Sequence, residues 1–256
     1  MAVTEVPEYF SSLSAEYTRK QYRSGARTFI AVRHAAVLEE VANLKLAGSA
    51  RVLDAGCGPG FLSRDLLDLG YRVVSMDLSE GMIREARNNI GLERASLSRG
   101  SIEALPYADS TFDLVCCCGV IEYLPDYEKA AREFLRVLKP GGFLILPTTN
   151  VLAPANYLYP MVEYLKGFSL VRRIYDAPPR RNFSMHFHSP SRMARRLRGI
   201  GFTLVSERFF FLLPIPRPFN LLLRSFSSRL EKGLARFCRT PILRYLGEGY
   251  LPVCQK

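Results

Sequence analysis

Absences narrow what this chain of 256 residues can be. No stretch approaches the ~20 consecutive apolar residues that a membrane-spanning helix needs. The longest apolar candidate, residues 209–216, is short and interrupted by proline. The first residues are acidic and include Pro7, so they do not form a secretory signal peptide. There is no internal repeat and no low-complexity tract. We therefore expect a globular protein in the cytoplasm.

Metal-binding and nucleic-acid-binding motifs are also missing. The six cysteines have no metal-ligand spacing. Cys116, Cys117 and Cys118 are consecutive in a predicted strand over 112–118, and neighbouring strand residues point to opposite faces, so they cannot converge on one ion. Zinc motifs and glycine-arginine repeats are absent. We expect no metal site and no nucleic-acid partner.

A glycine-rich turn stands out among the features that are present. The apolar run 51–55 predicts a buried strand, and helical spacing begins at Phe61. Between them, Gly56, Gly58 and Gly60 let the backbone turn sharply and approach a ligand closely. Open α/β sheets hold nucleotides at such a strand–turn–helix junction. The third glycine of the dinucleotide fingerprint would fall on Phe61, which argues against a nicotinamide or flavin cofactor.

The turn resembles motif I of the S-adenosylmethionine-dependent methyltransferases with a Rossmann-like fold. Four further segments resemble that family's motifs in the same order: 72–79, 100–106, 112–124 and 136–146. The resemblance covers roughly residues 50–150. It implies an α/β fold with a doubly wound, mostly parallel, seven-stranded sheet and helices on both faces. It also implies an enzyme with S-adenosyl-L-methionine as cofactor, similar to the ubiquinone/menaquinone-type and natural-product methyltransferases.

The same resemblance implies a set of cofactor-binding residues. Asp77 lies 23 residues after Asp54, close to the ~20-residue offset of an acid that accepts hydrogen bonds from ribose hydroxyls. A helix N-cap is the alternative role for Asp77. Asp54 is expected either to orient the methionine ammonium group or simply to stabilise the turn. The complete set is Asp54, Gly56, Cys57, Gly58, Gly60, Met76, Asp77, Leu78, Ser101, Ile102, Cys118 and Gly119.

Two of the three histidines, His186 and His188, provide candidates for acid–base chemistry. They directly precede a predicted helix that starts at Ser189-Pro190. This segment resembles small-molecule methyltransferases, which carry a histidine just before the corresponding helix. Histidine titrates near neutral pH and could deprotonate a hydroxyl group. A structural hydrogen bond between lid and sheet is the alternative role. Because the two positions are close, they could exchange roles.

The order of strand-like and helix-like segments predicts a single domain over 1–256. We expect a helical cap over 1–47, a cofactor-binding core over 48–150 and a lid insertion over 151–188. The last strands then occupy 189–256. They are interrupted by a basic amphipathic insertion over 212–247, whose central helix we expect over 218–237.

Charge is unevenly distributed along the chain. Residues 1–150 contain 17 basic and 19 acidic side chains, whereas residues 151–256 contain 18 basic and 5 acidic ones. In the predicted helix 218–237, Arg224, Arg229, Lys232 and Arg236 lie mostly off an apolar stripe. The stripe predicts either packing against the domain or binding to an anionic membrane surface. A solubilising surface rich in arginine is the alternative explanation of the charge.

The expected function is methylation of a small, apolar or amphipathic acceptor, with O-methylation slightly favoured. Nucleic-acid methyltransferases carry Asn/Asp-Pro-Pro-Tyr/Phe or Pro-Cys after the fourth strand, where this chain has Cys118-Gly-Val-Ile. Two alternatives stay open. One is a membrane-peripheral methyltransferase of a lipid or lipid-linked intermediate. The other is a non-catalytic cofactor-binding partner in a biosynthetic complex.

Overall fold

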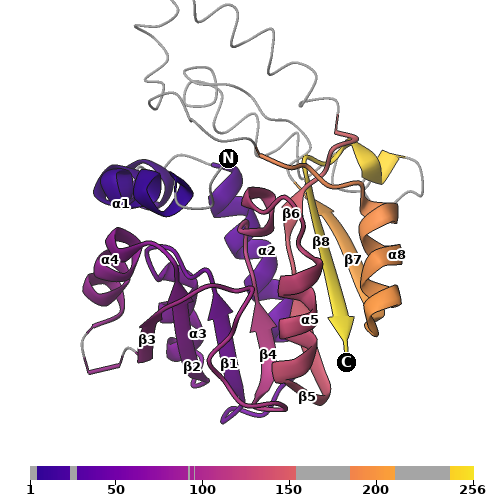
Figure 1. Cartoon of the computed structure of the whole chain (residues 1–256), viewed down its shortest axis with the longest axis horizontal. Helices are drawn as coiled ribbons and strands as arrows, with labels where there is room; N and C mark the ends of the chain where they lie inside the picture. The colour runs from indigo at the N-terminus through magenta and orange to yellow at the C-terminus, as the bar shows by residue number, and fades with distance from the viewer. Residues whose placement is uncertain (1–4, 24–27, 92, 95, 154–184, 211–242) are drawn as a thin grey trace, which may run out of the picture.

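The computed structural model describes residues 5–23, 28–91, 93–94, 96–153, 185–210 and 243–256, and Figure 1 shows a central sheet with helices on both faces. The strands are β1 (Arg51–Ala55), β2 (Arg72–Asp77), β3 (Ser96–Arg99), β4 (Phe112–Cys116), β5 (Leu138–Ile145), β6 (Thr148–Thr149), β7 (Thr203–Phe210) and β8 (Gly249–Gln255). The helices are α1 (Glu5–Thr18), α2 (Phe29–Asn43), α3 (Phe61–Asp68), α4 (Glu80–Ile90), α5 (Glu128–Val137) and α8 (Pro190–Ile200). Short helical turns are η1 (Arg19–Arg23), η2 (Ile121–Tyr123) and η4 (Leu243–Leu246).

The sheet has the topology expected of a doubly wound fold. Its strand order is β3-β2-β1-β4-β5-β8-β6, and β7 pairs with β8. Strands β1 to β5 are parallel to one another, whereas β8 runs antiparallel to β5, β6 and β7. The two-residue β6 adds to the seven strands expected from the sequence. The prediction of a mostly parallel sheet with helices on both faces is confirmed.

Apolar side chains on the two faces of the sheet form separate cores. In β1, Val52 packs in the core beneath α2 and α3, and Leu53 packs in the core beneath α5 and α8. Successive strand residues point to opposite faces, and both of these side chains are fully buried. A strand that is apolar on both faces can exist only where helices cover both. The polar ends of such strands are therefore the places left for a site.

Element boundaries differ from the sequence-based ones at two strands. The strand expected over 112–118 ends at Cys116, so Cys117 and Cys118 belong to the turn that follows it. The alternation of strand-like and helix-like segments also predicts a strand over 142–147, whereas the corresponding strand, β5, begins earlier, at Leu138. The first difference matters for the site, because a residue beyond the strand end is free to face the carboxyl edge of the sheet.

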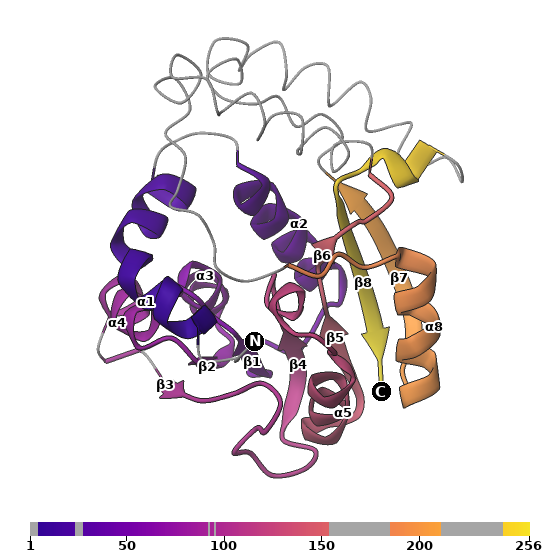
Figure 2. The ribbon, with the colours of Figure 1, turned by 45° about the horizontal axis from the view of Figure 1, so that its top comes forward.

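The described N-terminal residues are mostly helical, in α1, η1 and α2, and the helical cap over 1–47 stays a prediction. Figure 2 shows α1 above α4 at the carboxyl end of the parallel strands, with α2 continuing beside the sheet. Most of the predicted lid over 151–188 lies outside the described residues, as does the predicted helix 218–237. Among the described helices, none is long and apolar enough to span a bilayer.

Candidate functional site

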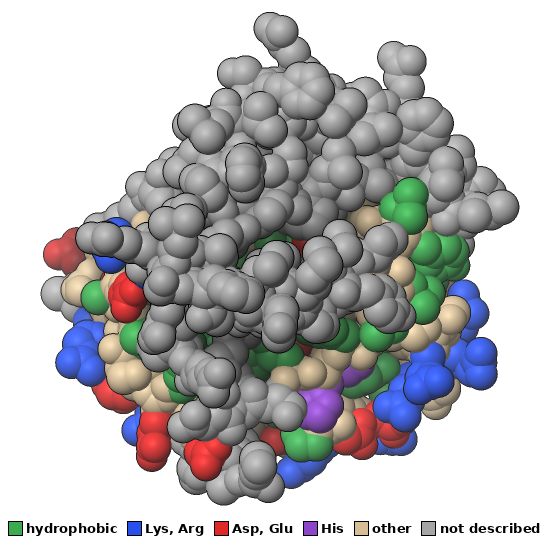
Figure 3. All heavy atoms as spheres, turned by 90° about the horizontal axis from the view of Figure 1, so that it is seen from above, with side chains coloured by type: hydrophobic (Ala, Val, Ile, Leu, Met, Phe, Trp, Pro, Cys, Tyr) green, Lys and Arg blue, Asp and Glu red, His purple; other side chains and the backbone are tan. Residues whose placement is uncertain are grey.

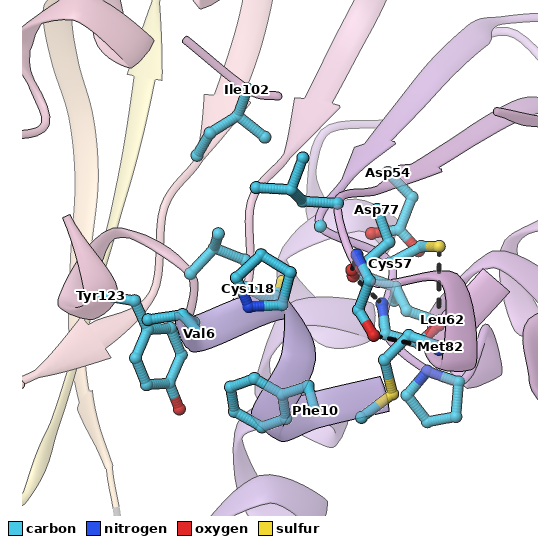
Figure 4. Close-up of a pocket in the computed structure, with 18 of the residues that line it drawn as sticks. Val6, Phe10, Asp54, Cys57, Leu62, Asp77, Met82, Ile102, Cys118 and Tyr123 are labelled. Atoms are coloured by element: carbon cyan, nitrogen blue, oxygen red, sulfur yellow. Dashed lines mark hydrogen bonds between the residues drawn. The ribbon is translucent and has the colours of Figure 1, made fainter. Parts of the chain in front are cut away.

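A cavity lies at the carboxyl ends of β1, β2 and β4, beneath α1 (Figure 4). Ten of the twelve predicted cofactor-binding residues line it: Asp54, Gly56, Cys57, Gly58, Asp77, Leu78, Ser101, Ile102, Cys118 and Gly119. Gly60 and Met76 are not among the lining residues: Gly60 is the N-cap of α3, and Met76 is fully buried in the core. Residues far apart in the sequence thus meet where open α/β sheets hold ligands.

The glycine turn after β1 has a conformation that needs glycine. Gly56, Gly58 and Gly60 all have positive φ angles, of 79°, 52° and 79°, which residues with a Cβ rarely adopt. A Cβ on Gly56 would also lie 2.3 Å from a Val120 methyl carbon across the cavity wall. The N–H groups of Gly56 and Cys57 both donate to the Met76 carbonyl oxygen, which fixes the turn against β2.

Asp77 ends β2 with both carboxylate oxygens already oriented. Its Oδ2 accepts from the Gly58 N–H at 2.9 Å, and its Oδ1 accepts from the Ser79 N–H at 2.8 Å. Burial raises the pKa of this carboxyl group. Each carboxylate oxygen can accept a further hydrogen bond, and the side chain lines the cavity. The carboxylate is therefore positioned to accept from two neighbouring hydroxyl groups of a ligand.

A second buried acid, Asp54, stands beside Asp77 in Figure 4. Its carboxylate accepts from the Ser63 hydroxyl, which in turn accepts from the Ser75 hydroxyl at 2.8 Å. Burial raises the pKa of Asp54 to about 7, against the opposing effect of the Ser63 hydrogen bond. A carboxyl group with this pKa in a cavity wall would favour a ligand that carries positive charge.

The far ends of the cavity have different chemistry. Ser101 and Ile102 provide one hydroxyl and one apolar side chain, and the Ser101 hydroxyl is held by the Glu103 N–H at 3.2 Å. Cys118 and Gly119 lie in the turn after β4, where burial raises the pKa of the Cys118 thiol to about 12. That thiol is therefore neutral at physiological pH and acts as a small wall residue.

Arg33 is a cavity residue that motif reading did not find. It lines the cavity from α2 and is only 9% exposed. Within the described residues its guanidinium makes no ion pair and no hydrogen bond. It lies 5.9 Å from the Phe29 ring centroid, and a Cβ on Gly119 would overlap it. A buried cation without an anionic partner indicates a place for an anion. No motif marks it, because it is a single basic residue in an otherwise apolar helix.

The two candidate catalytic histidines do not line the described cavity wall. His186 has an exposed side chain, and its N–H donates to the Glu122 carbonyl oxygen at 2.7 Å. His188 packs edge-on against Tyr127, and burial lowers its pKa. Both therefore contact the turn that follows β4, which carries the wall residues Val120 and Tyr123. Their catalytic role stays a prediction.

Helix α1 closes the cavity from above with apolar and aromatic side chains. Phe10 packs edge-on against Tyr123 with ring centroids 5.2 Å apart. Ser11 joins α1 to the start of α4, because its hydroxyl lies 2.9 Å from the Ser79 hydroxyl and accepts from the Gly81 N–H. A Cβ on Gly81 would lie 2.6 Å from the Ser11 backbone. The glycine is thus what lets the two helices meet.

The described residues contain no group of three histidine, cysteine, aspartate or glutamate side chains that could hold a metal ion. The chemistry available in the cavity is instead that of three acids (Asp54, Asp77 and Glu103), one arginine, one histidine (His34), a glycine turn and an aromatic roof. This set fits a ligand with a hydroxylated sugar, a carboxylate and a cationic group.

Comparisons with known proteins agree with this geometry. Residues 53–146 match the family model described as a methyltransferase domain. The chain is 40% identical over 130 residues to a ubiquinone biosynthesis O-methyltransferase of Xanthomonas oryzae pv. oryzae, covering 48% of this chain and 53% of that protein. It is also 40% identical over 108 residues to a malonyl-[acyl-carrier protein] O-methyltransferase of Enterobacter lignolyticus, covering 42% of each. The chain thus spans about half the length of these relatives.

Two solved structures share the fold at low sequence identity. One is a putative methyltransferase in complex with the Trm112 methyltransferase activator of Haloferax volcanii, with a TM-score of 0.64, 22% identity and 96% of each chain covered. The other is the Burkholderia thailandensis 1,6-didemethyltoxoflavin-N1-methyltransferase with bound S-adenosylhomocysteine. Its TM-score is 0.59 at 18% identity, covering 100% of this chain and 91% of that one. These likenesses show the fold.

Proposed function

We propose that the chain, whose residues 53–146 match the methyltransferase-domain family model, transfers the methyl group of S-adenosyl-L-methionine to a small, apolar or amphipathic acceptor. The observation that carries the proposal is the cavity in which the glycine turn, Asp77 and Arg33 face one another. S-adenosylmethionine supplies an activated methyl group on a sulfonium. The protein has to bind the cofactor and the acceptor, orient them toward one another and exclude water from the reacting atoms.

Each end of the cavity has a role in this binding. Asp77 would accept hydrogen bonds from the two ribose hydroxyls, while Ser101 and Ile102 would contact the adenine. At the other end, Arg33 would pair with the methionine carboxylate, and Asp54 would face the ammonium group. The glycine turn lets the backbone approach the ligand between these two ends. The apolar roof from α1 would keep water away from the reacting atoms.

The acceptor is proposed to be an oxygen nucleophile. The relatives at 40% identity are named O-methyltransferases, and the cavity is roofed by Phe10, Tyr17, Tyr22 and Tyr123. These rings favour a flat or apolar acceptor over a strongly hydrated one.

His186 is kept as the proposed base, with His188 as its possible substitute. Replacing both with alanine should lower kcat by about tenfold or more while S-adenosylhomocysteine affinity is unchanged. The measurement is transfer of labelled methyl to whichever phenol or carboxylic acid an acceptor screen identifies. Unchanged kcat in the double variant would leave catalysis to proximity and orientation.

The proposal is tested first by the variant Asp77→Ala. Loss of the paired ribose hydrogen bonds should weaken S-adenosylhomocysteine binding by roughly 1–3 kcal/mol. Isothermal titration calorimetry measures the change. Asp68→Ala is the matched control, because Asp68 is an exposed acid that pairs with Arg94 at 2.8 Å, away from the cavity. A wild-type chain that binds neither S-adenosylmethionine nor S-adenosylhomocysteine would end the proposal.

Cofactor binding should also rigidify α1. Because α1 supplies Val6, Pro7, Phe10 and Tyr17 to the cavity wall, bound S-adenosylhomocysteine should slow amide hydrogen exchange in residues 5–18 by about tenfold. Helix α8 serves as the internal reference, since it contributes no residue to the described wall. Equal slowing in both helices, or none in α1, would contradict a closing role for α1.

A further inference from the structure

Three segments that carry exposed apolar side chains meet at one corner of the carboxyl edge of the sheet. Leu152, Phe187 and Leu246 are 47%, 39% and 40% exposed. They come from three segments that are far apart in the sequence. Single exposed apolar residues are ordinary on a protein surface, but a cluster of them marks a contact site.

Asn150 holds the three segments together. Its side-chain amide donates to the carbonyl oxygens of Tyr245 and Gly247, both at 2.9 Å. Its backbone N–H donates to Glu248 at 2.7 Å, and the neighbouring residue 151 donates to the His188 carbonyl oxygen at 3.2 Å. Asn150 is completely buried. The corner is therefore a built part of the fold, fixed by one buried side chain.

Helix α8 begins at this corner and adds positive charge to it. Arg192 and Arg195 are exposed and make no ion pair within the described residues. The acids at the start of α5, Asp126 and Glu128, each lie 3.8 Å from Arg196 and are balanced by it. Figure 3, the view onto the carboxyl edge, shows hydrophobic and basic side chains next to one another along one rim. The rim thus combines apolar side chains with unbalanced arginines.

We propose that this rim, formed by Leu152, Phe187, Leu246, Arg192 and Arg195, docks the protein on an anionic phospholipid bilayer. Apolar side chains would enter the boundary between headgroups and acyl chains, and the arginines would bind the phosphate groups. The outward face of α8 carries arginine and serine and no large apolar side chain, so the apolar contact is confined to the corner, as shallow insertion requires. Docking on a bilayer would place the enzyme where an amphipathic acceptor resides, so this proposal rests on the proposed function.

The test is sedimentation of the full chain with vesicles of phosphatidylcholine and phosphatidylglycerol at low salt, compared with pure phosphatidylcholine. The wild type should bind only the anionic vesicles. The double variant Arg192→Gln/Arg195→Gln should bind about twenty-five-fold more weakly, since each of the two charges near the surface contributes on the order of a factor of five. The triple variant Leu152→Ser/Phe187→Ser/Leu246→Ser should lose binding to a similar extent.

Matched controls come from the same chain. Arg84→Gln/Arg87→Gln removes two exposed arginines from α4, and Leu69→Ser/Val205→Ser removes the other two large apolar side chains that are exposed in the described part of the chain. Both should bind like the wild type. S-adenosylhomocysteine affinity of every variant, measured by calorimetry, should be unchanged. A failed cofactor site would thus be distinguished from a failed membrane site.

Four outcomes would overturn the inference. The wild type could ignore anionic vesicles, or the control variants could lose as much binding as the rim variants. Binding could instead disappear only when Arg224, Arg229, Lys232 and Arg236 are replaced with glutamine, which would move the contact to the predicted helix 218–237. Binding to soluble polyglutamate with the same dependence on Arg192 and Arg195, but no vesicle binding, would indicate an acidic protein partner.

Discussion

Arg33→Ala is expected to weaken S-adenosylhomocysteine binding by about a hundredfold, because truncating one partner of a buried charge pair leaves the other charge unpaired. The guanidinium is buried in the cavity wall and has no anionic partner within the described residues. Glu122 acts on Arg33 electrostatically but forms no ion pair with it in the described part of the chain, and burial raises the pKa of that acid. The carboxylate of the proposed cofactor would be the missing partner.

Two companion variants sharpen this test. Arg33→Met should lose affinity to the same extent but keep or raise the melting temperature, since an unpaired buried charge is costly and methionine fills the space. Gly119→Ala should also lose affinity, because the new methyl group would displace the guanidinium. Wild-type affinity in Arg33→Ala, measured by calorimetry, would show that Arg33 does not hold the carboxylate.

Asp54→Asn is expected to stabilise the empty protein at pH 8 and leave its stability unchanged at pH 4. The folded-state pKa of Asp54 is about 7, against a reference value of 3.8. A raised folded-state pKa contributes stability that is present below the unfolded-state pKa and is lost as pH rises through the folded-state pKa. The wild type should therefore lose about 4 kcal/mol from this group between pH 4 and pH 8, and the neutral variant should not.

Urea unfolding of both proteins at the two pH values measures this difference without cofactor. Asparagine keeps an oxygen that can accept the Ser63 hydrogen bond, so the comparison isolates the charge. Cofactor affinity should change in the opposite direction, with the variant binding S-adenosylmethionine more weakly at pH 8 and similarly to the wild type at pH 5. An equal stability gain at pH 4 and pH 8 would show that ionisation of Asp54 is not the cause.

Much of the fold and of the cofactor site can be predicted from the sequence, because those parts depend on local chemistry. A turn that needs positive φ at Gly56, Gly58 and Gly60 can be recognised wherever it occurs. The acid at the end of the second strand follows from the register of parallel strands, which places Asp77 beside the glycine turn. Buried strands and covering helices follow from apolar periodicity alone.

The remaining parts depend on contacts between distant segments. Arg33 reaches the cavity because α2 packs against β7 and β8, and a single arginine in an apolar helix has no pattern to find. Met76 is fully buried in the core although it adjoins Asp77, and its side chain lies against Gly100, where an added Cβ would be 2.8 Å from the Met76 sulfur. His186 and His188 stand next to the turn after β4, yet their backbone and ring contacts there follow from tertiary structure rather than spacing.

The position of β8 has a consequence for how the chain folds while the ribosome makes it. Among the described strands, β7 pairs with β8 alone, and β8 in turn pairs with β5, so these pairings cannot hold β7 in the sheet until residues 249–255 have been made. During translation, β5 and β7 would each present an unpaired edge while the intervening residues are added. The late arrival of one strand between two earlier ones makes the nascent chain vulnerable to aggregation, and ribosome stalling before residue 249 should leave a chaperone-dependent intermediate.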